Sequence, residues 1–280
     1  MVILYTSNKG NFINLKNITI SEMESKGIKK NIYVNLTNRC PCACTFCLRA
    51  TKKMSETNSL WLEKEPTAEE VITEFENIDI NLYDEIIFCG FGEPTERLDA
   101  IIEISKYIKK RNSNMTIRIN TNGLGDLINK KEIAPLLKGL IDTVSISLNA
   151  PTAEEFYEIT KNKFGIESYD AIKKFAVSCK SYIPNVVFTV VDCIGEDDIK
   201  ASQKVCDDLD KELIEIIRDN IENVYSNWYL DELAIKWNTA IKNNNSDSWV
   251  IDGINQQYKF FNDFIRFKYE NSYYFRCIKI

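Results

Sequence analysis

Short apolar runs alternate with amphipathic stretches along most of this chain, and this alternation limits its fold more than any other feature. The strand-like runs are residues 31–37, 85–90, 115–121, 142–149 and 185–192. The stretches with helical spacing begin at Pro66 and then cover 95–111, 126–139, about 152–162 and 168–182. Strands that alternate with helices in this way lie parallel, with the helices packed outside the sheet. The sequence therefore predicts an α/β fold.

Polar residues recur on one face of three predicted strands. Successive side chains of a strand point to opposite faces, so each polar set has an aliphatic set behind it. The polar sets are Tyr33, Asn35 and Thr37; Arg118 and Asn120; and Ser145, Ser147 and Asn149. The helix layer takes the aliphatic face, so we expect the polar face to line the inside of a curved sheet and to form a ligand cavity.

Composition limits the domain organisation and the cellular compartment that we expect for the protein. Its 280 residues, 44% hydrophobic and 27% charged, suit one main globular domain with an appendage. No apolar run approaches the ~20 residues that span a bilayer, and residues 1–9 lack the features of a secretory signal. We therefore expect a cytoplasmic protein with no membrane association, in which thiols stay reduced and clustered cysteines indicate a metal site.

Charge and the lack of one residue type exclude several functions. The net charge is -6 and the pI is about 5.1, which disfavours a broad nucleic-acid surface despite the local basic pairs at 52–53 and 109–111. The chain has no histidine. A Ser-His-Asp triad, an HExxH protease and a His-ligated zinc deaminase are therefore excluded.

Four cysteines lie within eight residues directly after the first strand of the alternating pattern. Cys40, Cys44 and Cys47 have the CxxxCxxC spacing that holds three irons of a cubane cluster and leaves the fourth iron open. A zinc knuckle or chance clustering is the alternative. Cys42 has the wrong spacing for this set, so we interpret it as a packing or spectator residue. The alternative is that Cys42 replaces one of the three cysteines as a ligand. The remaining cysteines form no second CxxC group, which indicates one cluster at most.

Three further segments follow the cysteines in order, each at the carboxyl end of a predicted strand, where parallel sheets bind ligands. They are Gly90-Phe-Gly-Glu-Pro94, Asn120-Thr-Asn-Gly123 and Ser145-Ile-Ser-Leu-Asn149. Together with the cysteine loop they resemble radical S-adenosylmethionine (SAM) enzymes over about residues 30–200. The resemblance implies a partial parallel (β/α) barrel of five or six strands, one [4Fe-4S] cluster on the three cysteines, and bound SAM.

The resemblance also assigns residues to the cofactor and implies a reaction. The residues expected at SAM are Phe46, Gly90, Gly92, Glu93, Asn120, Thr121, Ser147 and Asn149. Gly90 and Gly92 would let backbone approach the ligand, Glu93 would accept from its ammonium, and Ser147 and Asn149 would bind ribose. Reductive cleavage of SAM would give a 5'-deoxyadenosyl radical that abstracts hydrogen from an unidentified substrate. No residue is assigned a catalytic role toward that substrate.

Each assignment has a simpler structural alternative. The Gly90–Pro94 segment also suits a turn that only ends a strand, and polar residues such as Thr121 commonly end strands. Phe46 suits either stacking near adenine or core packing. Arg118 suits either an anion ligand or a residue that snorkels at a strand edge, and Asp192 suits either an adenosyl contact or a helix cap. The competing function is a non-catalytic zinc-binding interaction module.

Segments around these motifs, among them Asn35–Cys40 and Leu60–Pro66, resemble the radical SAM proteins associated with TatD-type hydrolases. This subgroup implies such a hydrolase as a partner, and the chemistry implies an electron donor such as flavodoxin or ferredoxin. The chain departs from the subgroup after about residue 209, where residues 213–217 suit either a long helix or a sixth strand. We divide the chain into an extension (1–30), a core (31–221) and a mostly helical, aromatic-rich appendage (222–280).

Overall fold

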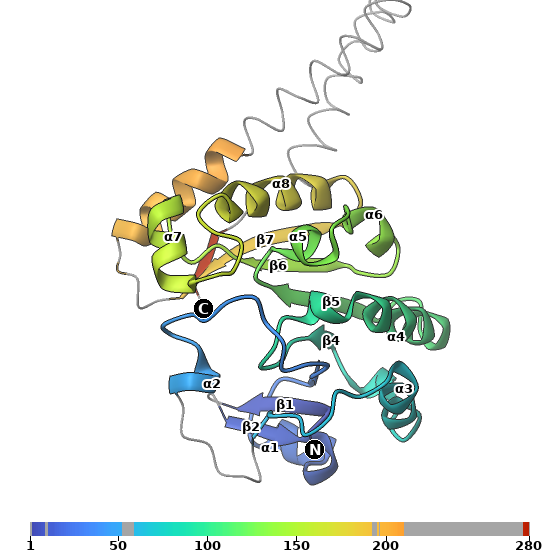
Figure 1. Cartoon of the computed structure of the whole chain (residues 1–280). Coiled ribbons are helices and arrows are strands. Elements are labelled where there is room, and N and C mark those ends of the chain that lie inside the picture. The colour runs from blue at the N-terminus through green and yellow to red at the C-terminus, as the bar shows by residue number, and fades with distance from the viewer. Residues whose placement is uncertain are drawn as a thin grey trace, which may run out of the picture. The chain divides into compact units, whose positions relative to one another are not determined.

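A computed structural model describes residues 2–8, 11–51, 59–191, 195, 197–209 and 277–279. This part of the chain contains one eight-stranded sheet with the order β2-β1-β3-β4-β5-β6-β7-β8 (Figure 1). The strands are β1 (Leu4–Asn8), β2 (Asn11–Asn14), β3 (Asn31–Val34), β4 (Glu85–Phe88), β5 (Thr116–Thr121), β6 (Thr143–Ser147), β7 (Asn185–Val190) and β8 (Cys277–Lys279). By contacts the chain divides into two compact units, 1–205 with 276–280, and 206–275.

Neighbouring strands from β3 to β8 pair in parallel, which confirms the predicted α/β fold with a largely parallel sheet. The sixth parallel strand is β8, which pairs with β7 from Phe188↔Cys277 to Val190↔Lys279. Its residues were expected in the helical appendage, and the alternative strand at 213–217 lies outside the described residues. Pairing at a sheet edge does not require neighbours in sequence, so periodicity gave no sign of this strand.

The expected extension at residues 1–30 adds two strands to the same sheet. β1 pairs antiparallel with β3 through Leu4↔Val34 and Tyr5↔Tyr33, and β2 forms a hairpin with β1. The short helices η1 (Leu15–Asn17) and α1 (Ile20–Ser25) then lead the chain back to β3. The parallel edge at β3 is thereby covered by a hairpin.

Helices follow the strands as the alternating pattern predicts. They are α2 (Leu48–Thr51), α3 (Ala68–Glu76), η3 (Ile80–Leu82), η4 (Pro94–Arg97), α4 (Leu98–Arg111), α5 (Gly125–Asn129), α6 (Ala134–Leu137), α7 (Ala153–Thr160), α8 (Ser168–Lys180) and a helix at 197–209. Thr67 and Glu70 form a capping box at the start of α3. The predicted helix at 126–139 is instead two short helices, because Lys130 turns into the left-handed region and Pro135 begins a new helix. None of the described helices is long and apolar enough to cross a membrane.

The predicted division of the strands into two faces is observed where the strands extend far enough. In β5, Ile117 and Ile119 are at most 1% exposed, whereas Arg118 and Asn120 alternate with them and are only half-buried. In β3 the alternation ends early, at Val34. Asn35 and Thr37 follow the strand, although the amide of Asn35 still donates to the carbonyl of Ile3 in register with the β1–β3 pairing. The inner face ends at one large cavity.

Candidate cofactor site

All eleven residues expected to hold the cluster and SAM line one cavity of about 680 Å³. They come from the loop after β3 and from the carboxyl ends of β4, β5 and β6. The three cysteines are Cys40, Cys44 and Cys47, and the others are Phe46, Gly90, Gly92, Glu93, Asn120, Thr121, Ser147 and Asn149. Tertiary folding thus brings four segments that span more than a hundred residues of sequence to one place.

The cysteine loop is anchored by its backbone. The amides of Ala43 and Thr45 donate to the carbonyls of Thr160 and Ile159, at 2.8 and 2.9 Å, at the end of α7. Within the loop, the amide of Cys47 donates to the carbonyl of Cys44 at 3.1 Å. These bonds hold the loop against the β6–α7 side of the cavity, where Asn149 also lies.

Arg49 closes the same loop from the other side. Its guanidinium donates to the carbonyl of Asn38 at 3.1 Å and to the carbonyl of Cys42 at 3.0 Å. The side chain of Asn38 exchanges two hydrogen bonds with the backbone of Leu62, at 2.7 and 3.0 Å. One arginine therefore ties the start of the loop to its middle.

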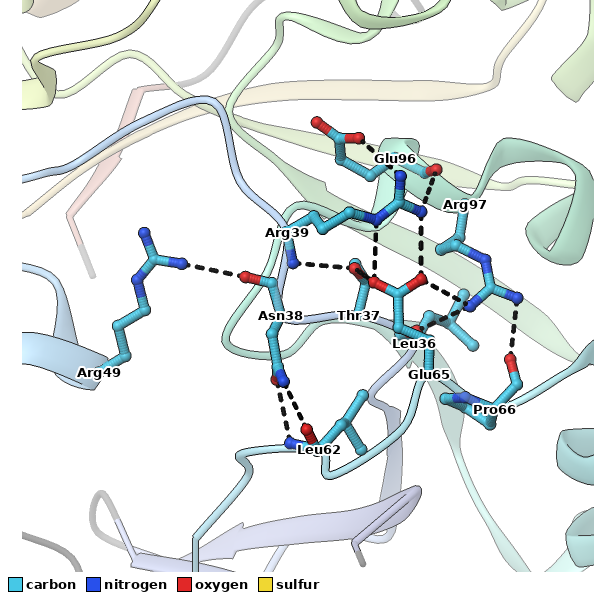
Figure 2. A network of polar contacts seen from close by, with 10 residues as sticks. All are labelled: Leu36, Thr37, Asn38, Arg39, Arg49, Leu62, Glu65, Pro66, Glu96 and Arg97. Atoms are coloured by element: carbon cyan, nitrogen blue, oxygen red, sulfur yellow. Dashed lines mark hydrogen bonds and ion pairs between the residues drawn. The ribbon is translucent and has the colours of Figure 1, made fainter.

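Figure 2 shows the ionic network that holds the residues before the first cysteine. Arg39 makes a two-point contact with the carboxylate of Glu65, through Nε at 2.9 Å and an η nitrogen at 3.2 Å. Glu65 also accepts from the Thr37 hydroxyl and pairs with Arg97 at 3.4 Å. Burial raises the pKa of Glu65, but the hydrogen bonds from Arg39 and Thr37 outweigh it and lower that pKa below its ordinary value. Thr37 thus acts outside the cavity.

Cys42 lies among the expected ligands and is 4% exposed. Its thiol donates hydrogen bonds toward Cys40 and Cys44, which lowers the pKa of both. The same bonds raise the pKa of Cys42 itself. The side-chain Nδ2 of Asn122 lies 3.6 Å from the sulfur of Cys42 and 3.9 Å from that of Cys40. A lowered pKa makes the thiolate, the form that binds metal, easier to reach for Cys40 and Cys44.

Glu93 is buried at the wall of the cavity, with an exposed fraction of 3%. Its Oε1 accepts from the hydroxyls of Thr95 and Thr121, both at 2.7 Å, and its Oε2 accepts from the amide of Asn122 at 2.7 Å. Burial raises the pKa of Glu93, and these hydrogen bonds oppose the rise. Oε2 retains capacity to accept from one further donor.

Gly90 and Gly92 are required by the chain itself. A Cβ on Gly90 would overlap Oδ1 of Asn35, and a Cβ on Gly92 would overlap the carbonyl oxygen of Thr37 and lie 2.6 Å from that of Arg39. The amide of Gly92 donates to the Thr37 carbonyl at 3.0 Å. The two glycines therefore let the β4 loop pack on the loop that leads to Cys40, a reason that the sequence did not reveal.

Two asparagine oxygens at the cavity lack a partner in the described part of the chain. Oδ1 of Asn149 and Oδ1 of Asn120 are buried and accept no hydrogen bond. Asn149 is 5% exposed and has a positive φ of 59°, a conformation that asparagine tolerates and that clusters at functional sites. A bound ligand with donor groups would satisfy both oxygens.

Several residues of the site escaped the sequence analysis. Arg49 contacts the cysteine loop although it lies outside every motif, and Asn122 contacts it from within the Asn120–Gly123 segment, where it had no assigned role. The wall also includes Tyr5 and Phe12 from the N-terminal hairpin. Arg118 pairs with Glu85 at 2.5 Å across β4 and β5, and its two alternative roles stay predictions. Asp192 and the basic pair at 52–53 lie outside the described residues.

The three cysteines supply the thiolate donors that an iron–sulfur cluster requires. Among the described residues, no three His, Cys, Asp or Glu side chains gather closely enough to hold one metal ion. Each cysteine of a cubane binds a different iron, so its thiolates need not converge on one point. The donor set therefore fits the predicted [4Fe-4S] cluster.

A model of the radical SAM superfamily matches residues 34–203, which is more than half of the chain. The chain therefore belongs to the radical SAM superfamily. The match includes the cysteine loop and the three motif-bearing strand ends. Membership supports the prediction that the protein is an enzyme and leaves its reaction class open.

The relatives differ in what their names state. The chain is 25% identical over 234 residues to the dual-specificity RNA methyltransferase RlmN of Nautilia profundicola, covering 78% of this chain and 60% of that protein. It is 29% identical over 206 residues to the molybdenum cofactor biosynthesis protein 1 of Drosophila melanogaster, covering 74% and 33%. A shorter match, 37% identical over 57 residues, covers 20% of this chain and 7% of the alkaline phosphatase-like protein PglZ of Bacillus cereus. The chain thus spans less than two thirds of each relative.

Proposed function

We propose that this protein binds one [4Fe-4S] cluster through Cys40, Cys44 and Cys47, binds SAM in the adjoining cavity, and catalyses radical chemistry on a substrate that enters the same cavity. One observation supports the proposal above all others. The cysteine loop and the three strand ends with cofactor motifs line a single cavity. When bound, the cluster would supply the electron that splits SAM into methionine and a 5'-deoxyadenosyl radical, which abstracts hydrogen from the substrate.

The residues of the cavity divide the task of holding SAM. Oε2 of Glu93 would accept from the ammonium of the methionine part, since that oxygen has one hydrogen bond and spare capacity. Ser147 would form hydrogen bonds with ribose hydroxyls, and the unpartnered Oδ1 of Asn149 would accept one from them. Phe46 lines this cavity and a second one of about 300 Å³ that also touches Asn149, a position suited to an adenine ring. The apolar remainder of the wall would exclude water.

Two features of the chain disfavour some of the substrate classes that are open to a radical SAM enzyme. RlmN acts on RNA by name, but this chain has a net charge of -6, which disfavours a long phosphate backbone as partner. With one cluster proposed, auxiliary-cluster peptide maturation is also disfavoured. Small molecules, nucleotides and protein glycyl sites are the classes that we propose to test.

The finer assignment rests on the sequence segments alone. We place the chain in the subgroup associated with TatD-type hydrolases because of the segments at 35–40 and 60–66, and we propose such a hydrolase as a partner. A low-potential donor such as flavodoxin or ferredoxin would supply the electron. Co-purification of a TatD-type hydrolase with the tagged protein would support the partnership, and its absence at matched expression would remove it.

The central experiment uses the reconstituted, reduced protein under anaerobic conditions. We expect about four iron and four sulfide per chain, and 5'-deoxyadenosine when SAM is added. Cys44→Ala should lose both, whereas Cys206→Ala, at a buried cysteine remote from the loop in sequence, should keep both. A product level equal to that of Cys44→Ala would reject the enzymatic proposal.

The competing proposal is a zinc-binding interaction module. Zinc would bind the same cysteine thiolates, with its ligands arranged around one point. The same metal analysis separates the two: stoichiometric zinc without acid-labile sulfide would favour the module.

A further inference from the structure

The cavity continues past the proposed cofactor residues to a wall of aromatic side chains that have no proposed role toward the cluster or SAM. This wall, here called the aromatic wall, consists of Tyr5, Phe12, Tyr33 and Phe91, with Leu60 and Ser7 beside them. Tyr5 and Phe12 come from the N-terminal hairpin, Tyr33 from β3, and Phe91 from the loop after β4. The hairpin at the sheet edge thereby contributes directly to the cavity.

The rings of the aromatic wall pack on one another in defined geometries. Tyr5 and Tyr33 are stacked, with ring centroids 5.1 Å apart and planes at 22°. Phe12 meets Tyr5 edge-on at 5.4 Å and meets Phe91 edge-on at 6.3 Å. The hydroxyl of Tyr5 donates to the carbonyl of Cys89 at 3.1 Å, so its polar end is occupied. Such packing keeps the rings in place and prepares them to receive another ring.

The two ends of the cavity differ in charge. Among the residues that the structure describes, the charged ones that line the cavity are Arg49 and Glu93, and both belong to the cofactor end. The described residues of the aromatic wall carry no charge, and burial raises the pKa of both Tyr5 and Tyr33. Arg118 and Glu85 also act on Tyr33, but these two charges pair with each other at 2.5 Å. A charged group would lose hydration here without gaining a partner among these residues.

The aromatic wall is also separate from the expected position of adenosine. Ser147 ends β6 and Asn149 follows it. In the sheet order β6 lies three strand spacings from β3, which carries Tyr33, and four from β1, which carries Tyr5, about 14 to 19 Å along the sheet. Between β3 and β6, the ends of β4 and β5 carry the methionine-side residues Gly90, Gly92, Glu93 and Asn120, and Phe91 of the same β4 loop belongs to the aromatic wall. The adenosine end and the aromatic wall therefore adjoin the methionine-side residues in one continuous space.

We propose that the aromatic wall is the substrate subsite, and that it binds a flat, uncharged ring. This inference rests on the proposed function, because it takes the other end of the cavity as the cofactor site. The ring lies against Tyr33 and Phe12, with its reacting position directed toward the cofactor end. The N-terminal hairpin is then a specificity element.

Matched probes test the charge and shape of this subsite. The reconstituted full-length protein, with SAM present, is titrated with indole, indole-3-carboxylate, tryptamine and cyclohexanol by ligand-observed NMR. We expect indole to bind, and both charged analogues to bind at least about tenfold more weakly because the wall gives them no counterion. Cyclohexanol is expected to bind more weakly than indole because it lacks a flat face. A charged analogue that binds as tightly as indole overturns the proposal.

Variants locate the binding to the aromatic wall. Tyr33→Leu and Phe12→Leu keep apolar bulk but remove a ring, and each is expected to weaken indole about three- to tenfold. Tyr33→Phe should restore the affinity, which separates loss of the ring from disturbance of the fold. Tyr157→Leu removes an exposed ring on α7 and serves as the matched control. Equal indole affinity in Tyr33→Leu, Phe12→Leu and the control would contradict the assignment.

Separate readouts distinguish this inference from the proposed function. SAM affinity is measured on the same variants, and a loss of SAM binding as large as the loss of indole binding would assign the wall to adenine and overturn the subsite. Indole binding that depends on the wall, without any 5'-deoxyadenosine from SAM, would retain the subsite and reject the radical chemistry. Production of 5'-deoxyadenosine with indole binding that is insensitive to the wall would reject the subsite and retain the radical chemistry.

Discussion

The hydroxyl of Thr121 donates a 2.7 Å hydrogen bond to Oε1 of Glu93 and accepts one of 3.0 Å from the amide of Gly123. These bonds join the end of β5 to the loop after β4, at the wall of the cavity. Thr121 lines the cavity, and its contact with the cofactor stays a prediction. Its hydroxyl also holds the carboxylate that we propose for the cofactor ammonium, so we expect it to act as a positioning residue.

Replacement of Thr121 by valine should therefore destabilise the protein. Valine has nearly the same shape but leaves Glu93 with one buried bond fewer and the Gly123 amide without its acceptor. We expect the free energy of unfolding to fall by about 1 to 3 kcal/mol in denaturant titrations. Thr121→Ser retains the hydroxyl and should lose less. Equal stability of the wild type and Thr121→Val would show that these bonds contribute nothing net.

The raised pKa of Glu93 predicts a specific pH dependence of stability. Burial, its largest cause, favours the protonated form in the folded state. The resulting stabilisation is present below the unfolded pKa, near the ordinary 4.5, and is lost as pH rises through the folded pKa. The free energy of unfolding of the apoprotein, minus that of Glu93→Gln, should thus decrease as pH rises from about 4, and then level off. Glu154→Gln, at an exposed position of α7, controls for removal of a carboxylate; a difference that increases with pH would contradict the sign.

Removal of the Asn35 side chain should restore stability to an alanine variant of Gly90 but not to one of Gly92. Gly90→Ala brings a methyl group against the side chain of Asn35, and Gly92→Ala brings one against backbone carbonyls. We expect each to cost about 1 to 3 kcal/mol of unfolding free energy. Adding Asn35→Ala should recover part of the loss in Gly90→Ala and none in Gly92→Ala, as a double-mutant cycle would measure. Equal recovery in both would show that the overlap with Asn35 is not the cause.

Removal of Arg49 should loosen the cysteine loop. Its two donors span the carbonyls of Asn38 and Cys42, so Arg49→Ala frees both ends of that clamp. We expect the reconstituted variant to lose iron to a chelator several-fold faster than the wild type. Arg49→Lys should be intermediate, because one ammonium group replaces a guanidinium that reaches two acceptors in a fixed geometry. Arg111→Ala is the matched control, since Arg111 likewise donates to two carbonyls, those of Phe75 and Ile78, away from the loop. Identical iron loss in the Arg49 and Arg111 variants would reject the clamp.

Much of the fold was accessible from local pattern. Apolar periodicity located all five predicted strands to within a few residues, and the alternation with helices predicted their parallel pairing. The pattern was less exact at the ends of elements. β3 ends at Val34, although the strand was expected to continue to residue 37, and the helix expected at 126–139 breaks at Lys130, whose backbone is left-handed.

The sequence predicted which residues line the candidate site, but not what each of them contacts. Motif order selected the three cysteines and the strand ends, because cluster spacing and glycine-rich turns are local in sequence. Whether Thr121 meets a ligand or Glu93, and whether Gly90 makes room for a cofactor or for Asn35, depends on contacts between segments far apart in sequence. The roles toward the cluster and SAM remain predictions for the experiments above.

The sequence by itself determined the superfamily, the α/β alternation and the cysteine loop, since each is written in the spacing of neighbouring residues. Only the tertiary structure decided that residues 277–279 complete the parallel strands and that an N-terminal hairpin supplies the aromatic end of the cavity. Hydrogen bonding at a sheet edge and the packing of rings join residues without regard to their distance along the chain. Such pairings have no local signature, and here they shape the space that we propose for the substrate.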